Sequence, residues 1–442
     1  MTSRRTLPFA LMLAGLFAFR LAYGLASEFW FDDELQIYLL GLKWFTTGAW
    51  PYLGPDVVYT HTQIPGALQG LLVGLPFFVA PVPEAPTVFL NALTFASLSL
   101  LAWYVCRRFP GMPRWLVWTW VMTAPWTINY GTRVVNPSYV LVFSVPFFVA
   151  FFETFLGGNR LLGRRTSLLL MGLATTCIMQ LHLSWVLLVP FALLALGSAA
   201  REARGSAARE ARGHVAPLVA SYGLGLFLGA VTLLPTFLQD AVRTPSTTAN
   251  VTLNADNLGN LLLVLGRFFL FAGFDVYLWL GHSGVARGEV LVELPWMVPL
   301  VVFLSAVGCL QLVLFTAGFF RRDGSREWHR LAWVTLGTVL MTWVAFFFSV
   351  KEPSPHTFCI LLPLAMFYSF HCYEWLFAKS RRWLIVFEAA VVCGFLTAGG
   401  LGLHNLRHHS LYLDRARVER AIAEGDHTQL GVRRADLWGY GY

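Results

Sequence analysis

Hydrophobic residues gather into long continuous blocks along the chain, and polar residues collect between the blocks. Many blocks approach 20 residues, which is about the length a helix needs to cross the hydrocarbon core of a membrane. They lie at 7–26, 64–80, 86–105, 114–130, 137–157, 166–181, 182–198, 215–238, 258–281, 295–320, 331–350, 356–377 and 383–403. This pattern predicts an all-α fold, a polytopic bundle of transmembrane helices. It excludes an outer-membrane barrel, whose strands would alternate apolar and polar residues in segments of about ten.

Composition supports the same class. Charged residues make up 13% of the chain and hydrophobic residues 57%, whereas soluble globular proteins are roughly 25% charged. Most soluble enzyme folds and a nucleic-acid-binding role are therefore excluded. The net charge of +8 needs no acidic partner, because Lys and Arg accumulate in cytoplasmic loops. None of the six cysteines forms a CxxC pair, so neither a disulfide framework nor a thiolate metal site is indicated.

The charge pattern also predicts orientation. Basic stretches at 159–165, 201–214, 321–330 and 379–382 read as cytoplasmic, and the segment 26–63 holds five carboxylates and one lysine and reads as external. The expected alternation of loops between the two sides of the membrane then fails at two places. One of the blocks 64–80 and 86–105 must be re-entrant or interfacial, and 258–281 must begin and end outside, as a juxtamembrane helix would. We therefore expect about 11 crossings.

The domain organisation follows from this topology. Residues 1–403 form the predicted membrane core, with a first external loop at 26–63 and a second large external segment at 239–294. The polar tail, 404–442, contains apolar residues at helical spacing between Leu411 and Glu424, which predicts a short amphipathic helix on the external face.

Three adjacent carboxylates are the sharpest chemical feature. Asp32, Asp33 and Glu34 follow the first apolar block and are framed by aromatic residues. Arg20 lies inside that block, where an unpaired charge would be costly, and we interpret the arginine and the carboxylates as a polar cavity open to the outside. The alternative is an acidic external loop that only obeys topology.

Several other polar residues fall on the same predicted side. His182 lies at an external helical turn and His61 lies near Pro65, and either histidine has a structural alternative. The external cations have the alternative of snorkelling at the interface; they are Arg133, Arg267 and Lys351. A metal site built from Asp33, Glu34 and His61 is conceivable, although no spacing is diagnostic of one.

Three short motifs resemble a known family. They are Asp33-Glu34 with the aromatic stretch to Pro51 and the turn His61-Thr-Gln-Ile-Pro65, then Arg133-Val-Val-Asn-Pro137, and finally Lys351-Glu-Pro-Ser-Pro-His356. Over roughly residues 1–380 the chain resembles the integral-membrane GT-C glycosyltransferases, particularly glycosyltransferase family 39, the protein O-mannosyltransferase and lipid A aminoarabinose transferase group. Thr357 stands where that family tends to place Tyr.

The resemblance implies a function. The family transfers a sugar, with inversion, from a polyprenyl-phosphate-linked donor to an acceptor glycan, lipid or protein outside the cytoplasm. For this chain it implies a bacterial inner membrane location with a periplasmic active site. Asp33 would be the general base with Asp32 as its rival, and Glu34 would bind a sugar hydroxyl or a divalent metal ion, the one cofactor left open. Phosphate binding would fall to Lys351 and His356, with Arg133 and Arg267 as further cations.

Two other functions remain alternatives. A transporter or flippase of a lipid-linked sugar would use Arg20 and the carboxylates as a binding group, but it predicts internal repeats, and the sequence shows no convincing one. A ligase or polymerase of the O-antigen type would take a pyrophosphate-linked donor.

Overall fold

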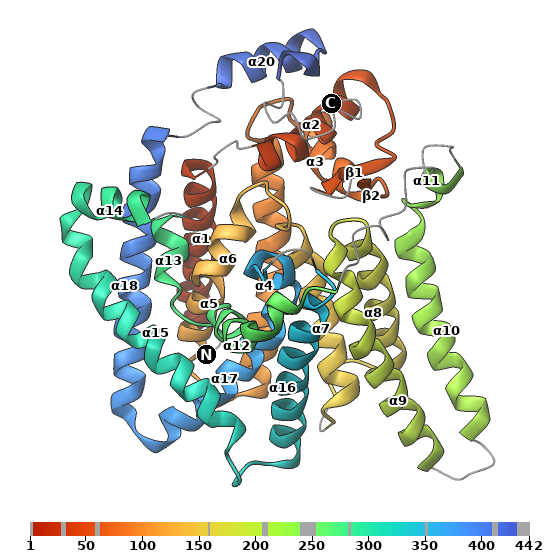
Figure 1. Ribbon diagram of the computed structural model, residues 1–442, viewed down its shortest axis with the longest axis vertical. Coiled ribbons are helices and arrows are strands. Elements are labelled where there is room, and N and C mark those ends of the chain that lie inside the picture. The colour runs from red at the N-terminus through yellow and green to blue at the C-terminus, as the bar shows by residue number, and fades with distance from the viewer. Residues whose placement is uncertain are drawn as a thin grey trace.

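The chain folds into a bundle of helices in a computed structural model, which describes residues 3–27, 32–57, 62–157, 160–205, 211–238, 253–281, 284–349, 352–408 and 414–430. Figure 1 shows long helices running side by side along the vertical axis, with α2, α3, the strands and α20 gathered at one end. The longer helices are α1 (Ser3–Ala26), α2 (Asp32–Thr47), α3 (Leu68–Val79), α4 (Ala85–Arg108), α7 (Val140–Phe155), α8 (Arg164–Met179), α9 (Val189–Gly205), α10 (Ala211–Ala230), α15 (Val298–Phe319), α16 (Arg326–Phe346), α17 (Leu362–Lys379) and α18 (Arg381–Asn405).

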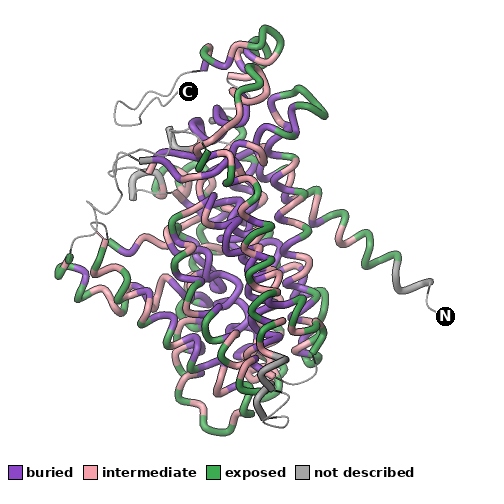
Figure 2. The backbone as a smooth tube through the Cα atoms, turned by 90° about the vertical axis from the view of Figure 1, so that its right-hand side faces the viewer, coloured by how far each residue is buried: buried purple, intermediate pink, exposed green. Residues whose placement is uncertain are grey.

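Six of the described helices are long and apolar enough to cross a membrane. They start at Leu7, Ala85, Leu183, Pro295, Pro355 and Arg381. Three shorter apolar helices accompany them, at Leu68–Val79, Val140–Phe155 and Val215–Ala230. The buried residues line the inside of the bundle and the exposed ones its outer surface (Figure 2). The prediction of an all-α polytopic membrane protein is confirmed, and the count of 11 crossings stays a prediction.

Helix length distinguishes the two blocks that broke the alternation. α3 has 12 residues and spans about 18 Å at 1.5 Å per residue, short of the roughly 30 Å of a hydrocarbon core. α4 has 24 residues and reaches about 36 Å. α4 is therefore the one of the two that is long enough to cross, and α3 is a short helix that packs on α2.

The predicted first external loop contains a hairpin that the sequence analysis did not predict. Strand β1 (Leu53–Val57) pairs antiparallel with β2 (Thr62–Pro65), with Asp56 opposite Gln63 and an irregularity between Leu53 and Asp56. The side-chain amide of Gln36 accepts a hydrogen bond from the Asp56 N–H at 3.0 Å. The hairpin is therefore tied to α2.

The block 258–281, which the sequence predicts to be a juxtamembrane helix, is divided into short helices. It forms η4 (Ala255–Asn260), α12 (Leu261–Leu270) and α13 (Val276–Leu280), followed by α14 (Gly284–Glu293) and η5 (Pro295–Met297). α12 packs against α16 and the 3-10 helix η6 (Pro355–Leu361), and α13 packs against α6. The segment therefore packs against the core helices.

A break divides the block 114–130 into α5 (Arg114–Thr123) and α6 (Pro125–Thr132). Pro125 has no N–H, so the break leaves carbonyls without helical donors. The buried guanidinium of Arg20 fills that gap: Nη1 lies 2.6 Å from the Met122 carbonyl oxygen and 3.2 Å from that of Thr127. Nη2 donates to the carbonyl of Gly131 at 3.1 Å.

These contacts correct one expectation. Arg20 is fully buried and points at backbone carbonyls of α5 and α6 instead of a cavity open to the outside. The sequence analysis paired its charge with carboxylates, but the backbone carbonyls of Met122 at the break, of Thr127 within α6 and of Gly131 at its end supply the compensation. Arg20 therefore joins α1 to the broken α5–α6 helix.

The tail forms the expected amphipathic helix. α20 (Arg415–Glu424) and the turn η8 (His427–Gln429) lie over α2, at the end of the bundle that also holds α3 and the strands (Figure 1). Val418 and Ala421 are fully buried in a small core shared with residues of α2, including Leu35 and Leu39.

Candidate functional site

The acidic residues of the first loop occupy the start of α2. That helix begins at Asp32, so Asp32, Asp33 and Glu34 form its first turn, where the helix dipole favours negative charge. The side chains of Asp32 and Asp33 lie outside the described residues, and so do His61 and Lys351. Glu34 is described and half-buried, and it is the member of the acidic group whose surroundings can be stated.

Glu34 lies near Tyr130, which also lies near two other charged residues. Tyr130 lies near the end of α6 with its ring stacked on Trp126, at 5.0 Å between centroids. Its hydroxyl interacts electrostatically with Glu34, Arg133 and Asp275. The structure therefore brings together the start of α2, the turn after α6 and the start of α13, which are far apart in sequence.

Asp275 is a buried carboxylate that the sequence analysis did not propose for the site. It caps α13: its Oδ1 accepts from the Leu278 N–H at 3.2 Å, and its Oδ2 accepts from the indole N–H of Trp126 at 3.0 Å. Burial raises the pKa of Asp275, and the hydrogen bonds and the charge of Arg287 oppose that rise. The signal in the sequence is an acidic residue inside an aromatic apolar run, which we used only to place the run outside the membrane.

Arg267 also lies near Asp275. It donates a hydrogen bond to the carbonyl of Pro353, and its guanidinium interacts electrostatically with Glu352 and Asp275. This hydrogen bond joins Pro353, just before η6, to α12. The helix η6 packs against α12 and against η1 (Leu183–Leu188), so it belongs to the same assembly.

Two histidines stand at the starts of two packed 3-10 helices. His182 is the N-cap of η1 (Leu183–Leu188), and its Nδ1 accepts from the Ser184 N–H at 3.1 Å. His356 is the second residue of η6, and its Nδ1 lies 2.8 Å from the Ser354 hydroxyl. Burial lowers the pKa of His182 to about 3, and the nearby His356 adds to the effect. Because its Nδ1 is an acceptor, the neutral His182 carries its proton on Nε2.

We call this assembly the external polar cluster, after the side of the membrane that the charge pattern predicts for it. Its members come from six elements or turns and are Glu34, Tyr130, Arg133, His182, Arg267, Asp275 and His356. The sequence analysis named five of them as candidates and missed Tyr130 and Asp275. Arg20, its sixth described candidate, lies apart in the α1–α6 contact.

The cluster combines acids with fixed cations. Glu34, Asp275 and Arg133 all lie around the Tyr130 hydroxyl, and Asp275 also lies near Arg267. Such a set can bind an anion such as phosphate through arginine while a carboxylate accepts a proton. Within the described residues, no three His, Cys, Asp or Glu side chains are grouped so that they could hold a metal ion.

Fold and site together define an integral membrane protein with an all-helical core and a polar cluster at one end. No protein-family model matches the chain, and no curated protein sequence matches it. Among solved structures, it is similar to the crystal structure of ArnT from Cupriavidus metallidurans bound to undecaprenyl phosphate. The two share 13% sequence identity with a TM-score of 0.49, over 95% of this chain and 75% of the other. A likeness at this level assigns neither a family nor a function.

Proposed function

We propose that this protein is a membrane glycosyltransferase that moves a sugar from a polyprenyl-phosphate donor to an acceptor at the external face. The observation that supports it most is the position of Tyr130. Its hydroxyl lies close to Asp275, to Arg133 and to Glu34 in the acidic first turn of α2. The motif resemblance to the GT-C enzymes points to the same reaction. Glycan, lipid and protein acceptors all fit this chemistry.

The reaction assigns a role to each charge. The acceptor hydroxyl attacks the anomeric carbon while Asp33 takes its proton, with Asp32 as the alternative base. The new bond from the acceptor oxygen to the anomeric carbon forms as the bond to the lipid phosphate breaks, which inverts that carbon. Charge develops on the leaving phosphate, and Arg133, Arg267 and His356 are the described groups that would stabilise it. Glu34 and Asp275 would bind sugar hydroxyls.

The test is donor consumption by the full-length protein in lipid nanodiscs. A panel of polyprenyl-phosphate sugars is supplied with envelope extract as the acceptor source, and transfer is measured beside native mass spectrometry of bound lipid. Asp33→Asn is expected to keep bound polyprenyl phosphate and lose transfer by a factor on the order of 100 or more. Arg133→Gln and Arg267→Gln are expected to weaken lipid retention.

Glu289→Gln, on an exposed position of α14, is the matched control and should behave as the wild type. Wild-type transfer by both Asp33→Asn and Asp32→Asn would overturn the assignment of the base. Retention of the donor with movement across the bilayer and no cleavage would replace the transferase with a flippase.

A further inference from the structure

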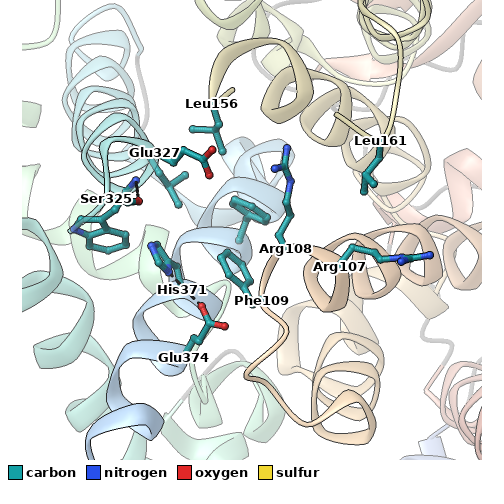
Figure 3. A pocket seen from close by; sticks show the side chains of 12 residues that line it. Arg107, Arg108, Phe109, Leu156, Leu161, Ser325, Glu327, His371 and Glu374 are labelled. Atoms are coloured by element: carbon teal, nitrogen blue, oxygen red, sulfur yellow. Dashed lines mark hydrogen bonds and ion pairs between the residues drawn. The ribbon is translucent and has the colours of Figure 1, made fainter. Parts of the chain in front are cut away.

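A second site lies at the opposite end of the bundle from the external polar cluster. α4 reaches from Glu84, which contacts α20, to Arg107 and Arg108 at its other end. There a pocket of about 550 Å³ opens between the end of α4, the start of α16 and the middle of α17 (Figure 3). The basic loops around it are those that the charge pattern assigns to the cytoplasm.

On one wall of the pocket, the charge of Arg108 is already paired within the protein. Arg108 forms an ion pair with the fully buried Glu153, with 2.8 Å between Nη2 and Oε1. The same carboxylate accepts from the Tyr104 hydroxyl at 2.8 Å and the Leu162 N–H at 3.0 Å. Because Arg108 is paired with Glu153, it is not available as a cation for a ligand.

Three charges remain for a ligand. Glu374 accepts the Gly111 N–H at 3.1 Å, and its Oε2 lies 3.8 Å from Nδ1 of His371. Glu327 is exposed and forms no ion pair with any described residue, and the same holds for Arg107, which rests over the ring of Trp103. The pocket thus offers two carboxylates and one guanidinium.

The rest of the lining is aromatic and apolar. The ring of His371 stacks on Phe109 at 5.2 Å and meets Trp328 edge-on at 4.4 Å. Leu156 and Leu161 border the same space on the side of α7 (Figure 3). A purely ionic ligand would leave this surface without a partner, whereas an amphiphile would cover it.

We propose that this pocket binds the headgroup of an aminophospholipid, which carries a phosphate and a primary ammonium. The ammonium lies against Glu327 and Glu374, and it can donate three hydrogen bonds. The phosphate lies at Arg107, in the last turn of α4, on the side of the pocket away from Glu327 (Figure 3). The glycerol and the start of the acyl chains cover Leu156 and Leu161. A quaternary ammonium has no N–H to donate, and an anionic glycerol headgroup would bring like charge to two carboxylates.

The test compares lipids retained by the whole protein. The protein is taken from nanodiscs with equal amounts of phosphatidylethanolamine, phosphatidylcholine and phosphatidylglycerol, and bound lipid is counted by native mass spectrometry. A preference for phosphatidylethanolamine on the order of tenfold is expected, because one charge-assisted hydrogen bond is worth about that factor. The double substitution Glu327→Gln and Glu374→Gln should bring the three lipids to parity. Arg107→Gln should reduce retention of all three.

Two further variants separate binding from folding. Leu161→Trp fills the pocket and leaves every charge in place, so it should abolish retention without a large change in melting temperature. Glu388→Gln and Arg381→Gln, on α18, are matched controls and should retain the preference. Equal retention of the three lipids by the wild type, or an unchanged preference in the double variant, would overturn the proposal. Soluble O-phosphoethanolamine that binds as tightly as the lipid would overturn the membrane as the source.

Discussion

The indole N–H of Trp126 donates to the carboxylate of Asp275 across 3.0 Å, joining α6 to the N-cap of α13 over 149 positions of sequence. Both residues are buried. Burial raises the pKa of Asp275 from its ordinary value of 3.8, and this hydrogen bond is among the interactions that hold the rise down. The contact therefore fixes the position of a carboxylate in the external polar cluster and favours its ionised form.

Trp126→Phe should raise the pKa of Asp275 further, since only the donor is lost. The buried carboxylate then lacks one partner, and the free energy of unfolding should fall by about 1–3 kcal/mol. Thermal denaturation in detergent measures the loss. Trp115→Phe, at a largely exposed position of α5, is the control. Equal losses in the two variants would contradict a specific role for the Asp275 contact.

His182 should make stability fall in acid. Its folded pKa is lowered to about 3 from the ordinary 6.5, so the unfolded chain binds a proton first as the pH drops. The stability that the neutral ring contributes is complete above about pH 6.5 and is lost progressively toward pH 3.

His182→Asn separates titration from capping, because the amide oxygen of Asn can still accept the Ser184 N–H. The melting temperature of this variant should fall less than that of the wild type between pH 7 and pH 4.5. His329→Asn, on α16, should keep the wild-type slope. Parallel curves for the wild type and His182→Asn would show that the ring does not titrate in this way.

Arg20→Lys tests the contact that replaced the expected polar cavity. A lysine keeps the charge but lacks the planar fork that reaches the carbonyls of Met122, Thr127 and Gly131 together. At least one buried carbonyl should lose its donor, at a cost of about 1–3 kcal/mol. Chemical denaturation by a graded detergent mixture measures it, and Arg382→Lys at an exposed position is the control. An unchanged unfolding midpoint would refute the structural role of Arg20.

The sequence predicted the elements that depend on hydrophobic length. The block 383–403 corresponds to α18 at Arg381–Asn405, and 86–105 corresponds to α4 at Ala85–Arg108. Both are continuous apolar runs whose ends are marked by arginines or polar residues. For 258–281 the sequence predicted a juxtamembrane helix, because Arg267 and Asp275 are too costly in a lipid-exposed span, but it did not predict the division into short helices.

The candidate site was predictable only in part. Arg133, Arg267 and His356 follow from charge at expected external turns, whereas Tyr130 joins them only because α6 turns after the Pro125 break. The partners of Arg20 could not be predicted, since backbone carbonyls carry no mark in the sequence. The hairpin at 53–65 was missed because the pairing of so short a segment depends on its packing against α2.

The tail helix provides the last prediction. Arg415 forms a two-pronged ion pair with Glu84, at 2.8 Å from Nε to Oε1, and Val418 is fully buried against α2. α2 begins with the acidic first turn, so the tail fixes the helix that carries the proposed base. Val418→Asp would place a charge in that small core, which is costly without a partner. We expect faster hydrogen exchange over residues 35–47 and a loss of transfer, while the exchange of α4 and α17 stays slow.

The ion pair can be tested apart from the core. Arg415→Glu should loosen α20 through repulsion from Glu84, and the double substitution with Glu84→Arg should restore slow exchange in α2. Arg420→Glu, an exposed position on the same helix, changes the charge equally without facing Glu84 and should have no such effect. If α2 exchanges slowly in Val418→Asp and in Arg415→Glu, the tail merely rests on α2 and does not hold it in place.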